Sequence, residues 1–458
     1  MAKKVTFDYD LIVIGTGAGG SAAATIAAQA GKKVAVIEAD TFGGDSPNWS
    51  DVPTKALLHV AHLYDEARHG ARFGLRSSTL GYNYPSLRTW KELAIKRTGA
   101  GGNRKYYENE GIATFTGSAH FLSPNEISVN RRHLSAAQFL VATGSHWVAP
   151  AIQGLADIPY LTPRTILEAM RPPKSLYIIG AGTIGVEIAQ LMATFGTKVY
   201  LSEIASRILP GEDEEVGILI ERVLREQKGV TSLTQTRTLS VVKDGIGKRV
   251  TYTRGDVEKS IKVDEILIAT GRTPSVDLGL DNASVTYTGK GIDVNEHLQT
   301  SARHIFAAGD VLGHNSHTHT ALLESRVAAH NLLHPRSKLS PDYTASPRLT
   351  FTNPGIASVG LSEDDCLKRD LRINTSIAPL NIIARSNTSD FRDGFVKIIA
   401  DKKGVILGAT VVAPHASEIV HELAIAIKFN HTAADVASTP HAFLSWSEAV
   451  RVAAAKLS

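Results

Sequence analysis

Residues 9–20 read YDLIVIGTGAGG, and this stretch decides the fold. An apolar run short enough for a buried parallel strand leads into a GxGxxG pattern, and an alanine-rich stretch that predicts a helix follows. The glycines of the pattern are Gly15, Gly17 and Gly20. They permit a tight turn and let a pyrophosphate approach the helix N-terminus, while Glu38, at the end of the next expected strand (residues 33–38), is placed to accept hydrogen bonds from a ribose. The sequence therefore predicts a dinucleotide-binding unit.

A second unit of the same kind begins near residue 175. An apolar run at residues 175–179 leads into GAGTIGVE, and the expected strand at residues 198–201 stops close to Glu203. The glycines of this pattern are Gly180, Gly182 and Gly185. Two such units predict two bound dinucleotides, as a flavin and a nicotinamide together require. The Glu203 carboxylate would bond a ribose 2′-hydroxyl and repel a 2′-phosphate, which favours NADH over NADPH, although Arg207 softens this preference if its side chain folds back.

Further along the chain, apolar strands end in short turns. VATGS at residues 141–145 and ILIATGRTP at residues 266–274 share an Ala-Thr-Gly turn that is typical of crossings between nucleotide domains. IFAAGDV at residues 305–311 ends in Gly309 and Asp310. From residue 343 the composition changes, and alternating apolar residues predict an antiparallel sheet with helices starting near residues 417 and 433.

The order and spacing of these motifs resemble the class I pyridine nucleotide-disulphide oxidoreductases, the family of dihydrolipoamide dehydrogenase, glutathione reductase and mercuric reductase. The resemblance covers essentially the whole chain. It implies an α/β fold with two Rossmann-like dinucleotide-binding domains and a C-terminal α+β dimerisation domain, bound FAD and NAD(H), and a homodimer. The implied domains are an FAD-binding domain at residues 1–150 and 272–340, an NAD(H)-binding domain at residues 151–271 and an interface domain at residues 343–458.

The resemblance also assigns roles to single residues. Lys55 corresponds to the family's lysine beside flavin N5, where a cation stabilises the charge of reduced flavin, and Glu187 to its ion-pair partner near the nicotinamide. Taken singly, each is equally well explained as an exposed helix charge. Asp310 resembles the acid that binds the flavin ribityl chain. The other residues implied to contact the cofactors lie in the Ala-Thr-Gly turns and at the head of the helix after Asp310, and they are Thr143, Gly144, Gly271 and Ala321.

Residues 43–58, GGDSPNWSDVPTKALL, depart from the family where its chemistry lies. Relatives carry two cysteines five positions apart in this segment, and Ser46 and Asp51 stand at those positions here. A hydroxyl and a carboxylate form neither a disulfide nor a thiolate, so disulfide chemistry is excluded by the residue types. Asp51 is interpreted either as a plain helix N-cap or as a carboxylate that tunes reactivity or relays a proton to the acceptor. Ser46 is interpreted as a space-filling remnant, because no base adjoins it.

A second departure lies near the C-terminus. Relatives carry a His and Glu pair that the partner subunit supplies to shuttle protons, but Phe443 stands at the histidine position while Glu448 remains. His441 is either a partial substitute or a bonded loop residue. Phe443 with Trp446 nearby predicts a more apolar mouth, which favours an aromatic acceptor.

The predicted function is that of an FAD-dependent NADH oxidoreductase without disulfide chemistry. Hydride passes from NADH to FAD, and electrons leave to a small acceptor such as a quinone, a dye, oxygen or a metal ion. Lys55, Glu187, Asp51 and Glu448 are the candidate catalytic residues. Two alternatives remain open: a soluble nicotinamide transhydrogenase, and a non-catalytic FAD- and NADH-binding redox sensor.

Composition and charge narrow the possible partners, the location and the metal content of the protein. The 458 residues carry a net charge of +4 without a basic tail, which gives no reason to expect nucleic acid or a membrane surface as partner. A single cysteine, Cys366, is compatible with a reducing, cytoplasmic location, and the start of the chain shows no secretory signal. Three histidines at residues 313–319, GHNSHTH, have spacings that suit a metal, but no cysteine or acid completes a site, so no metal is expected.

Overall fold

The computed structural model describes residues 6–76 and 80–458. The chain forms two compact units, each built from three segments. The first unit comprises Met1–Ala56, Thr89–Val148 and Gly271–Tyr343, and the second comprises Leu57–Arg88, Ala149–Thr270 and Thr344–Ser458. One glycine motif lies in each unit, so the repeat seen in the sequence corresponds to two separate nucleotide-binding folds.

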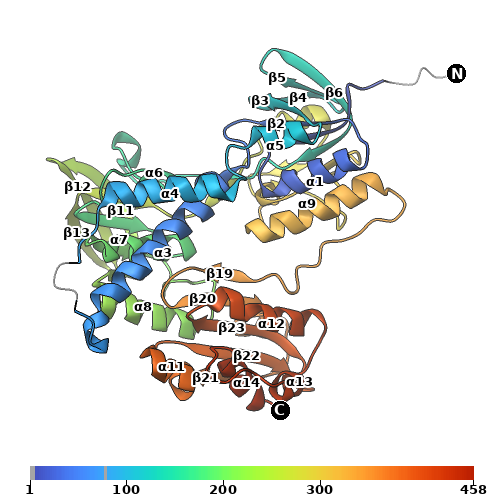
Figure 1. Cartoon of the computed structure of the whole chain (residues 1–458). Coiled ribbons are helices and arrows are strands. Elements are labelled where there is room, and N and C mark those ends of the chain that lie inside the picture. The colour runs from blue at the N-terminus through green and yellow to red at the C-terminus, as the bar shows by residue number, and fades with distance from the viewer. Residues whose placement is uncertain (1–5, 77–79) are drawn as a thin grey trace. The chain divides into compact units, whose positions relative to one another are not determined.

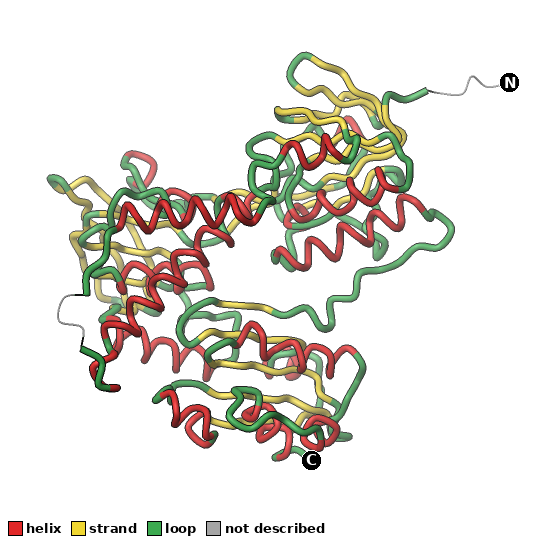
Figure 2. Tube along the Cα trace, in the orientation of Figure 1, coloured by secondary structure: helices red, strands yellow, loops and turns green. Residues whose placement is uncertain are grey.

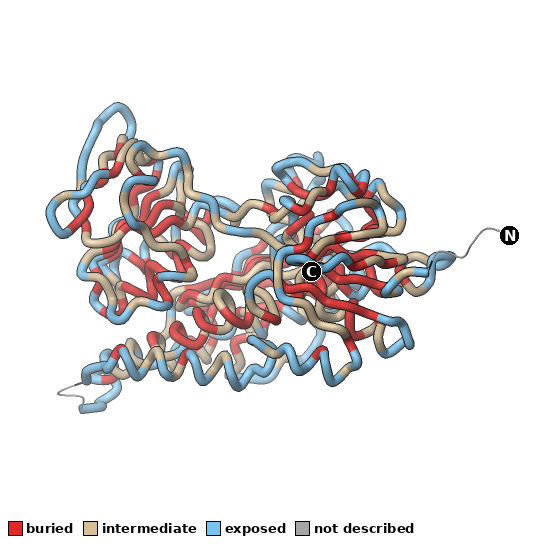
Figure 3. The backbone as a smooth tube through the Cα atoms, turned by 90° about the horizontal axis from the view of Figure 1, so that it is seen from above, coloured by how far each residue is buried: buried red, intermediate tan, exposed pale blue. Residues whose placement is uncertain are grey.

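The first unit is built on a parallel sheet in the order β3-β2-β1-β6, and β18 pairs in parallel with residues 139–141 of β6, the part that also pairs with β1. Its strands are β1 (Tyr9–Ile14), β2 (Val34–Glu38), β3 (Ala113–Thr116), β6 (Arg132–Val141) and β18 (Ile305–Ala307). The antiparallel strands β5 (Glu126–Val129) and β4 (Ala119–Ser123) extend the sheet beyond β6. The central strands are buried on both faces, as Figure 3 shows in red, which explains why they read as continuous apolar runs.

Two helices of the first unit pack side by side in Figure 1, α1 (Ala18–Gln29) and α9 (Thr318–Leu333). The Ala23 amide donates to Ser325 Oγ at 3.0 Å, which fixes the two helices against each other. Among the described residues, four more α-helices lie between β2 and β3 in the chain: α2 (Asp45–Asn48), α3 (Asp51–Arg68), α4 (Tyr84–Thr98) and α5 (Arg104–Asn109).

The second unit contains its own parallel sheet in the order β10-β9-β8-β14. These strands are β8 (Ser175–Ile179), β9 (Lys198–Ser202), β10 (Thr231–Leu233) and β14 (Glu265–Ile268). The helices α7 (Thr183–Thr194) and α8 (Glu214–Lys228) follow β8 and β9, and an antiparallel sheet is formed by β11 (Thr236–Asp244), β12 (Gly247–Arg254) and β13 (Val257–Val263). The repeated strand, glycine turn, helix and strand are therefore confirmed.

The same unit ends in a five-stranded antiparallel sheet in the order β19-β20-β23-β22-β21, drawn in yellow in Figure 2. Its strands are β19 (Arg348–Thr350), β20 (Gly355–Gly360), β21 (Ile373–Pro379), β22 (Phe395–Asp401) and β23 (Ile406–Ala413). The helix α12 (Ala416–Lys428) packs on β20 and β23, and α14 (Glu448–Ala455) packs on β21 and β22. α12 and α13 (Ala433–Ser438) are the two helices predicted from the sequence.

In the described ranges, 6–76 and 80–458, none of the helices combines the length and the apolar character that a membrane crossing requires.

Candidate functional site

In the first glycine loop, residues 15–20, two of the glycines leave no room for a side chain. Gly15 has φ +101°, and a Cβ added to it would lie 2.2 Å from Ala142 O. A Cβ on Gly20 would lie 2.1 Å from Gly15 O. By contrast, a Cβ on Gly17 would meet only Gly44 Cα at 3.7 Å, so the space in front of the α1 N-terminus is open to a ligand. This cradle fits a pyrophosphate.

Glu38 closes the loop from the end of β2. Its Oε2 accepts hydrogen bonds from the Thr16 amide at 3.0 Å and the Thr16 hydroxyl at 2.6 Å, and its Oε1 accepts one from the Asp40 amide at 3.0 Å. A carboxylate has about four lone-pair positions. Glu38 therefore keeps acceptor capacity for one ribose hydroxyl.

The second glycine loop repeats this geometry. Gly180 has φ +103°, and a Cβ on Gly185 would lie 2.0 Å from Gly180 O. Gly182 precedes α7 with φ −72° and ψ −174°, nearly the −70° and −169° of Gly17 before α1. Glu203 accepts hydrogen bonds from the amides of residues 181 and 205 at 2.8 and 3.0 Å, as Glu38 does from those of residues 16 and 40.

Arg207 is held away from the Glu203 carboxylate. Its Nη2 donates to the Glu212 carbonyl at 3.0 Å. The guanidinium is therefore engaged by the loop before α8, and the condition under which it would soften the preference of Glu203 is not met in this structure.

The two residues at the expected cysteine positions contact each other. Ser46 Oγ donates to Asp51 Oδ2 at 2.7 Å, and Thr318 Oγ1 donates to the same oxygen at 2.7 Å. Lys55 Nζ lies 3.5 Å from Asp51 Oδ1. Burial acts to raise the pKa of Asp51, but the Lys55 charge and the two hydroxyls outweigh it, so this pKa lies below its usual value.

Asp51 differs from the predicted helix cap. It is the first residue of α3, so the cap position falls one residue earlier, and a short helix, α2 (Asp45–Asn48), precedes it. The side chain of Asp51 is 46% exposed. Asp51 is therefore an ionised, partly exposed carboxylate held in place by two hydroxyls.

Four residues that sequence reasoning missed form a network around Asp310. Arg272 Nε donates to Ser145 Oγ at 2.7 Å, and Ser145 Oγ donates to Asp310 Oδ2 at 2.6 Å. Arg272 Nη1 also pairs with Asp45 at 2.8 Å, and its guanidinium lies over the Trp147 ring. In the sequence, only the two Ala-Thr-Gly turns point to this network, because the strand pairing that brings the turns together is long-range.

That pairing connects β7 (Ser145–Trp147) to β15 (Arg272–Pro274). Thr143 Oγ1 donates to Ser275 O at 2.7 Å, and the Ser275 amide donates to the Gly144 carbonyl at 2.9 Å. Gly144 and Gly271 both take positive φ, +67° and +127°. The Thr143 side chain therefore links the two segments that contain the Ala-Thr-Gly turns.

The head of α9 carries the histidine-rich segment. The Ala321 amide donates to His317 O at 2.9 Å, so this N–H is already engaged within the first turn of the helix. The rings of His317 and His319 stack at 5.4 Å, and His314 lies edge-on to Tyr343. Within the part of the chain that the structure describes, no group of three or more His, Cys, Asp or Glu side chains is arranged to hold a metal ion.

Glu187 is buried, with 1% of its surface exposed. Its Oε1 accepts a hydrogen bond from the Phe351 amide at 2.7 Å. The interpretation of Glu187 as an ordinary exposed charge is therefore wrong, since α7 packs inside the second unit.

One family model, the pyridine nucleotide-disulphide oxidoreductases, matches residues 9–325, which is more than half of the chain. The chain belongs to the pyridine nucleotide-disulphide oxidoreductase family. The dimerisation domain of that family matches residues 346–454 and supports a homodimer. Members of the family are flavin-dependent oxidoreductases that bind FAD and NAD(H), and the two glycine cradles with their carboxylates fit these cofactors.

Two curated relatives match over nearly their full lengths. A mercuric reductase from Streptomyces lividans is 35% identical, with 97% of this chain and 95% of that protein covered. A dihydrolipoyl dehydrogenase from Geobacillus stearothermophilus is 32% identical, with 98% and 96% covered.

Solved structures agree with the fold. LpdA from Mycobacterium tuberculosis matches with a TM-score of 0.86 and 27% identity, covering 98% of this chain and 99% of that one. The HOCl-induced flavoprotein disulfide reductase RclA from Escherichia coli matches with a TM-score of 0.86 and 25% identity, with the same coverage.

The dimerisation domain of this oxidoreductase contains Phe443, which stands where relatives carry a histidine. Phe443 is 75% exposed, and the Leu444 amide donates to Glu448 Oε2 at 3.1 Å. His441 Nδ1 contacts Thr439 O at 2.8 Å and its Nε2 lies 3.5 Å from Glu422, as expected of a bonded loop residue.

Trp446 does not line an exposed mouth, contrary to the prediction. It is 9% exposed and packs edge-on against Phe391 with ring centroids 6.0 Å apart. The Arg385 guanidinium lies over its ring. Trp446 therefore belongs to the core of the dimerisation domain, while the neighbouring Phe443 and Leu444 are exposed apolar side chains.

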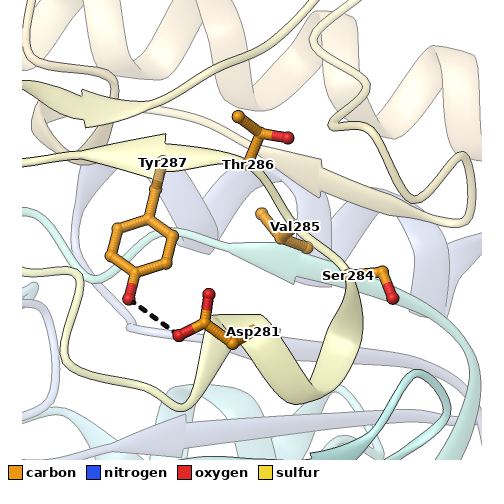
Figure 4. Close-up of a pocket in the computed structure, with 5 residues that line it drawn as sticks. All are labelled: Asp281, Ser284, Val285, Thr286 and Tyr287. Atoms are coloured by element: carbon orange, nitrogen blue, oxygen red, sulfur yellow. Dashed lines mark hydrogen bonds between the residues drawn. The ribbon is translucent and has the colours of Figure 1, made fainter.

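A hollow of about 590 Å³ lies elsewhere in the first unit (Figure 4). Its lining includes Asp281 and Tyr287, whose hydroxyl donates to the Asp281 carboxylate at 3.3 Å. None of the residues discussed above lines it, so it is separate from the cofactor cradles.

Proposed function

We propose that this oxidoreductase is FAD-dependent, prefers NADH and delivers electrons to a small acceptor other than a disulfide. The observation that carries the proposal is the 2.7 Å hydrogen bond from Ser46 to Asp51, the residues at the relatives' cysteine positions. Neither side chain undergoes thiol–disulfide exchange. The single cysteine, Cys366, is buried in α10 (Glu363–Lys368), and burial raises the pKa of its thiol, which disfavours the reactive thiolate.

In this proposal, residues 1–150 and 272–340 hold FAD, residues 151–271 hold NADH and residues 343–458 form the dimer. Glu38 and Glu203 bind ribose hydroxyls, and Asp310 binds the ribityl chain. When bound, FAD accepts a hydride from NADH and releases the electrons to the acceptor.

Lys55 supplies positive charge next to the redox centre, and Asp51 moderates that charge from 3.5 Å away. Because the pKa of Asp51 lies below its usual value, its carboxylate is ionised at neutral pH. An ionised carboxylate has no proton to donate. Asp51 therefore acts by tuning the field of Lys55 and not as an acid.

Replacing Asp51 by asparagine tests this tuning role. The change removes the negative charge that lies 3.5 Å from Lys55 Nζ, so we expect NADH to bleach the flavin band about two- to fivefold faster, the scale of a partly exposed ion pair. The factor should be the same from about pH 5 to about pH 8, because Asp51 stays ionised across this range. A pH profile whose shape changes would instead indicate proton relay, and an unchanged rate would leave Asp51 without either role.

The preference for NADH rests on the Glu203 carboxylate. Replacing Glu203 by alanine removes an ionised acceptor whose hydrogen bonds are worth about 1.5–3 kcal/mol, so we expect NADH to bind roughly 10- to 100-fold more weakly. The ratio of NADH to NADPH affinity should fall at the same time, since the repulsion of a 2′-phosphate is lost. Tryptophan fluorescence titrations with both nucleotides measure this, and Glu221→Ala, on the following helix, is the matched control.

An acceptor screen tests the proposed function. Protein reduced with NADH under anaerobic conditions is mixed with a quinone, a dye, oxygen and a metal ion, and the return of the flavin band is followed. Phe443, exposed and without a transferable proton, favours an aromatic acceptor. A metal ion belongs in the screen because relatives are mercuric reductases and RclA has been solved as a Cu(II) complex. Fast reoxidation by a disulfide instead would reject the proposal.

A further inference from the structure

Glu324 is a buried carboxylate that the proposed chemistry does not use. It lies on α9 in the first unit with 1% of its surface exposed. Its Oε2 accepts a hydrogen bond from the Gly309 amide at 2.6 Å, and its Oε1 accepts one from the Tyr343 hydroxyl at 2.8 Å. Glu324 thus ties the segment after β18 to the end of the first unit.

The turn that Glu324 holds carries Asp310 and contacts the first glycine loop. Gly309 takes φ +82° directly before Asp310. On the other side, a Cβ on Gly19, in the first turn of α1, would lie 2.7 Å from Ala308 O and 3.4 Å from Gly309 Cα. The same turn therefore adjoins the helix N-terminus that fits a pyrophosphate.

The groups around Glu324 do not neutralise it. Asp310 is a like charge on the adjoining turn, and α1 contains no ionisable side chain. The ring of His314 lies edge-on to Tyr343, and burial lowers the pKa of His314, which keeps it uncharged near neutral pH. Arg326 on the same helix is exposed. In the described ranges no lysine or arginine forms an ion pair with Glu324.

Burial without a cation disfavours the charged carboxylate. Burial is the main cause that raises the pKa of Glu324 to about 7, with a smaller contribution from Asp310. The hydrogen bonds from Gly309 and Tyr343 act in the opposite direction. Glu324 therefore exchanges a proton within the physiological range.

We propose that Glu324 is a positioning residue that couples FAD binding to proton uptake: it holds the turn of Gly309 and Asp310, and it takes up a proton when the anionic cofactor occupies the adjoining glycine loop. The proposal rests on the placement of FAD given above, but not on the identity of the electron acceptor.

The sign of the coupling follows from electrostatics. Bound FAD brings the negative charge of its pyrophosphate and displaces water, and both effects raise the pKa of a nearby carboxyl. A pKa that is higher in the complex means that FAD binds more tightly to the protonated form. Affinity therefore rises as the pH falls from the higher pKa of the complex to about 7, and it levels off below that. Each unit of pKa rise corresponds to about a tenfold change in affinity.

The test measures the FAD dissociation constant of the full-length protein by flavin fluorescence from about pH 5.5 to about pH 9. We expect affinity to increase about tenfold towards acid pH. Glu324→Gln, which mimics the protonated side chain, should bind FAD tightly with a flat profile. Tyr343→Phe removes a donor to the carboxylate and should move the inflection to higher pH. Glu212→Gln, which changes a half-buried carboxyl of the second unit, is the control and should keep the wild-type profile.

A flat wild-type profile would overturn the proposal, as would a Glu324→Gln profile that keeps the wild-type inflection. If Glu324→Gln does not fold, the Tyr343→Phe inflection decides by itself. Reduction by NADH and the acceptor screen are measured separately, so a failure of this coupling is distinct from a failure of the proposed function.

Discussion

Replacing Lys55 by methionine is expected to slow the bleaching of the flavin band by NADH by about 10²- to 10³-fold, the usual effect of removing one preorganised electrostatic group. Lys55 lies in the first turns of α3, with 28% of its side chain exposed and Asp51 as an ion-pair partner. Methionine keeps the length of the apolar stem and removes only the charge. Stopped-flow absorbance at saturating NADH measures the rate.

Lys55→Arg is the matched control, because it retains the positive charge and should lose far less of the rate. If Lys55→Met reduced its flavin as fast as the wild type, the lysine would have no electrostatic role. If it lost FAD altogether, the role would be in cofactor binding, and the proposed assignment would be wrong.

Replacing Ser46 and Asp51 together by cysteine is expected to restore a redox-active disulfide. The side chains of these residues already meet at 2.7 Å, so two cysteines are placed close to each other without a large movement of the backbone. Anaerobic titration with dithionite should then consume one further pair of electrons per FAD than the wild type does. The added disulfide should also accept electrons from NADH.

The single variants Ser46→Cys and Asp51→Cys are the controls, since one thiol cannot form the intrachain bridge. Turnover of an external disulfide should stay slow even in the double variant, because Phe443 provides no proton transfer. A double variant that consumes no additional electrons would show that this segment does not hold two cysteines in the geometry that a disulfide requires.

Structural features formed by residues that are close together in the sequence were predicted well. Gly15, Gly20 and Glu38 lie within one strand, turn, helix and strand, and their spacing alone fixes the geometry that the structure shows. The second loop repeats it with Glu203. Local steric requirements leave few other residue types at these positions.

Features that depend on distant parts of the chain were not predictable. The contact between Arg272 and Ser145 spans 127 positions and exists only because β7 pairs with β15. Trp446 was assigned to a surface because a short motif does not reveal that Phe391 covers it. Glu187 is buried, and its carboxylate accepts a hydrogen bond from the Phe351 amide, 164 positions away. The Arg272 contact and the burial of Trp446 and Glu187 are all set by tertiary packing.

The most direct test of the central claim compares acceptors under one set of conditions. The steady-state oxidation of NADH by purified, FAD-loaded protein is measured with a quinone, with Cu(II), with oxidised lipoamide and with glutathione disulphide. We predict turnover with a quinone or the metal ion and no turnover with either disulfide. Turnover of a disulfide at a rate equal to or above that of the other acceptors would contradict the account.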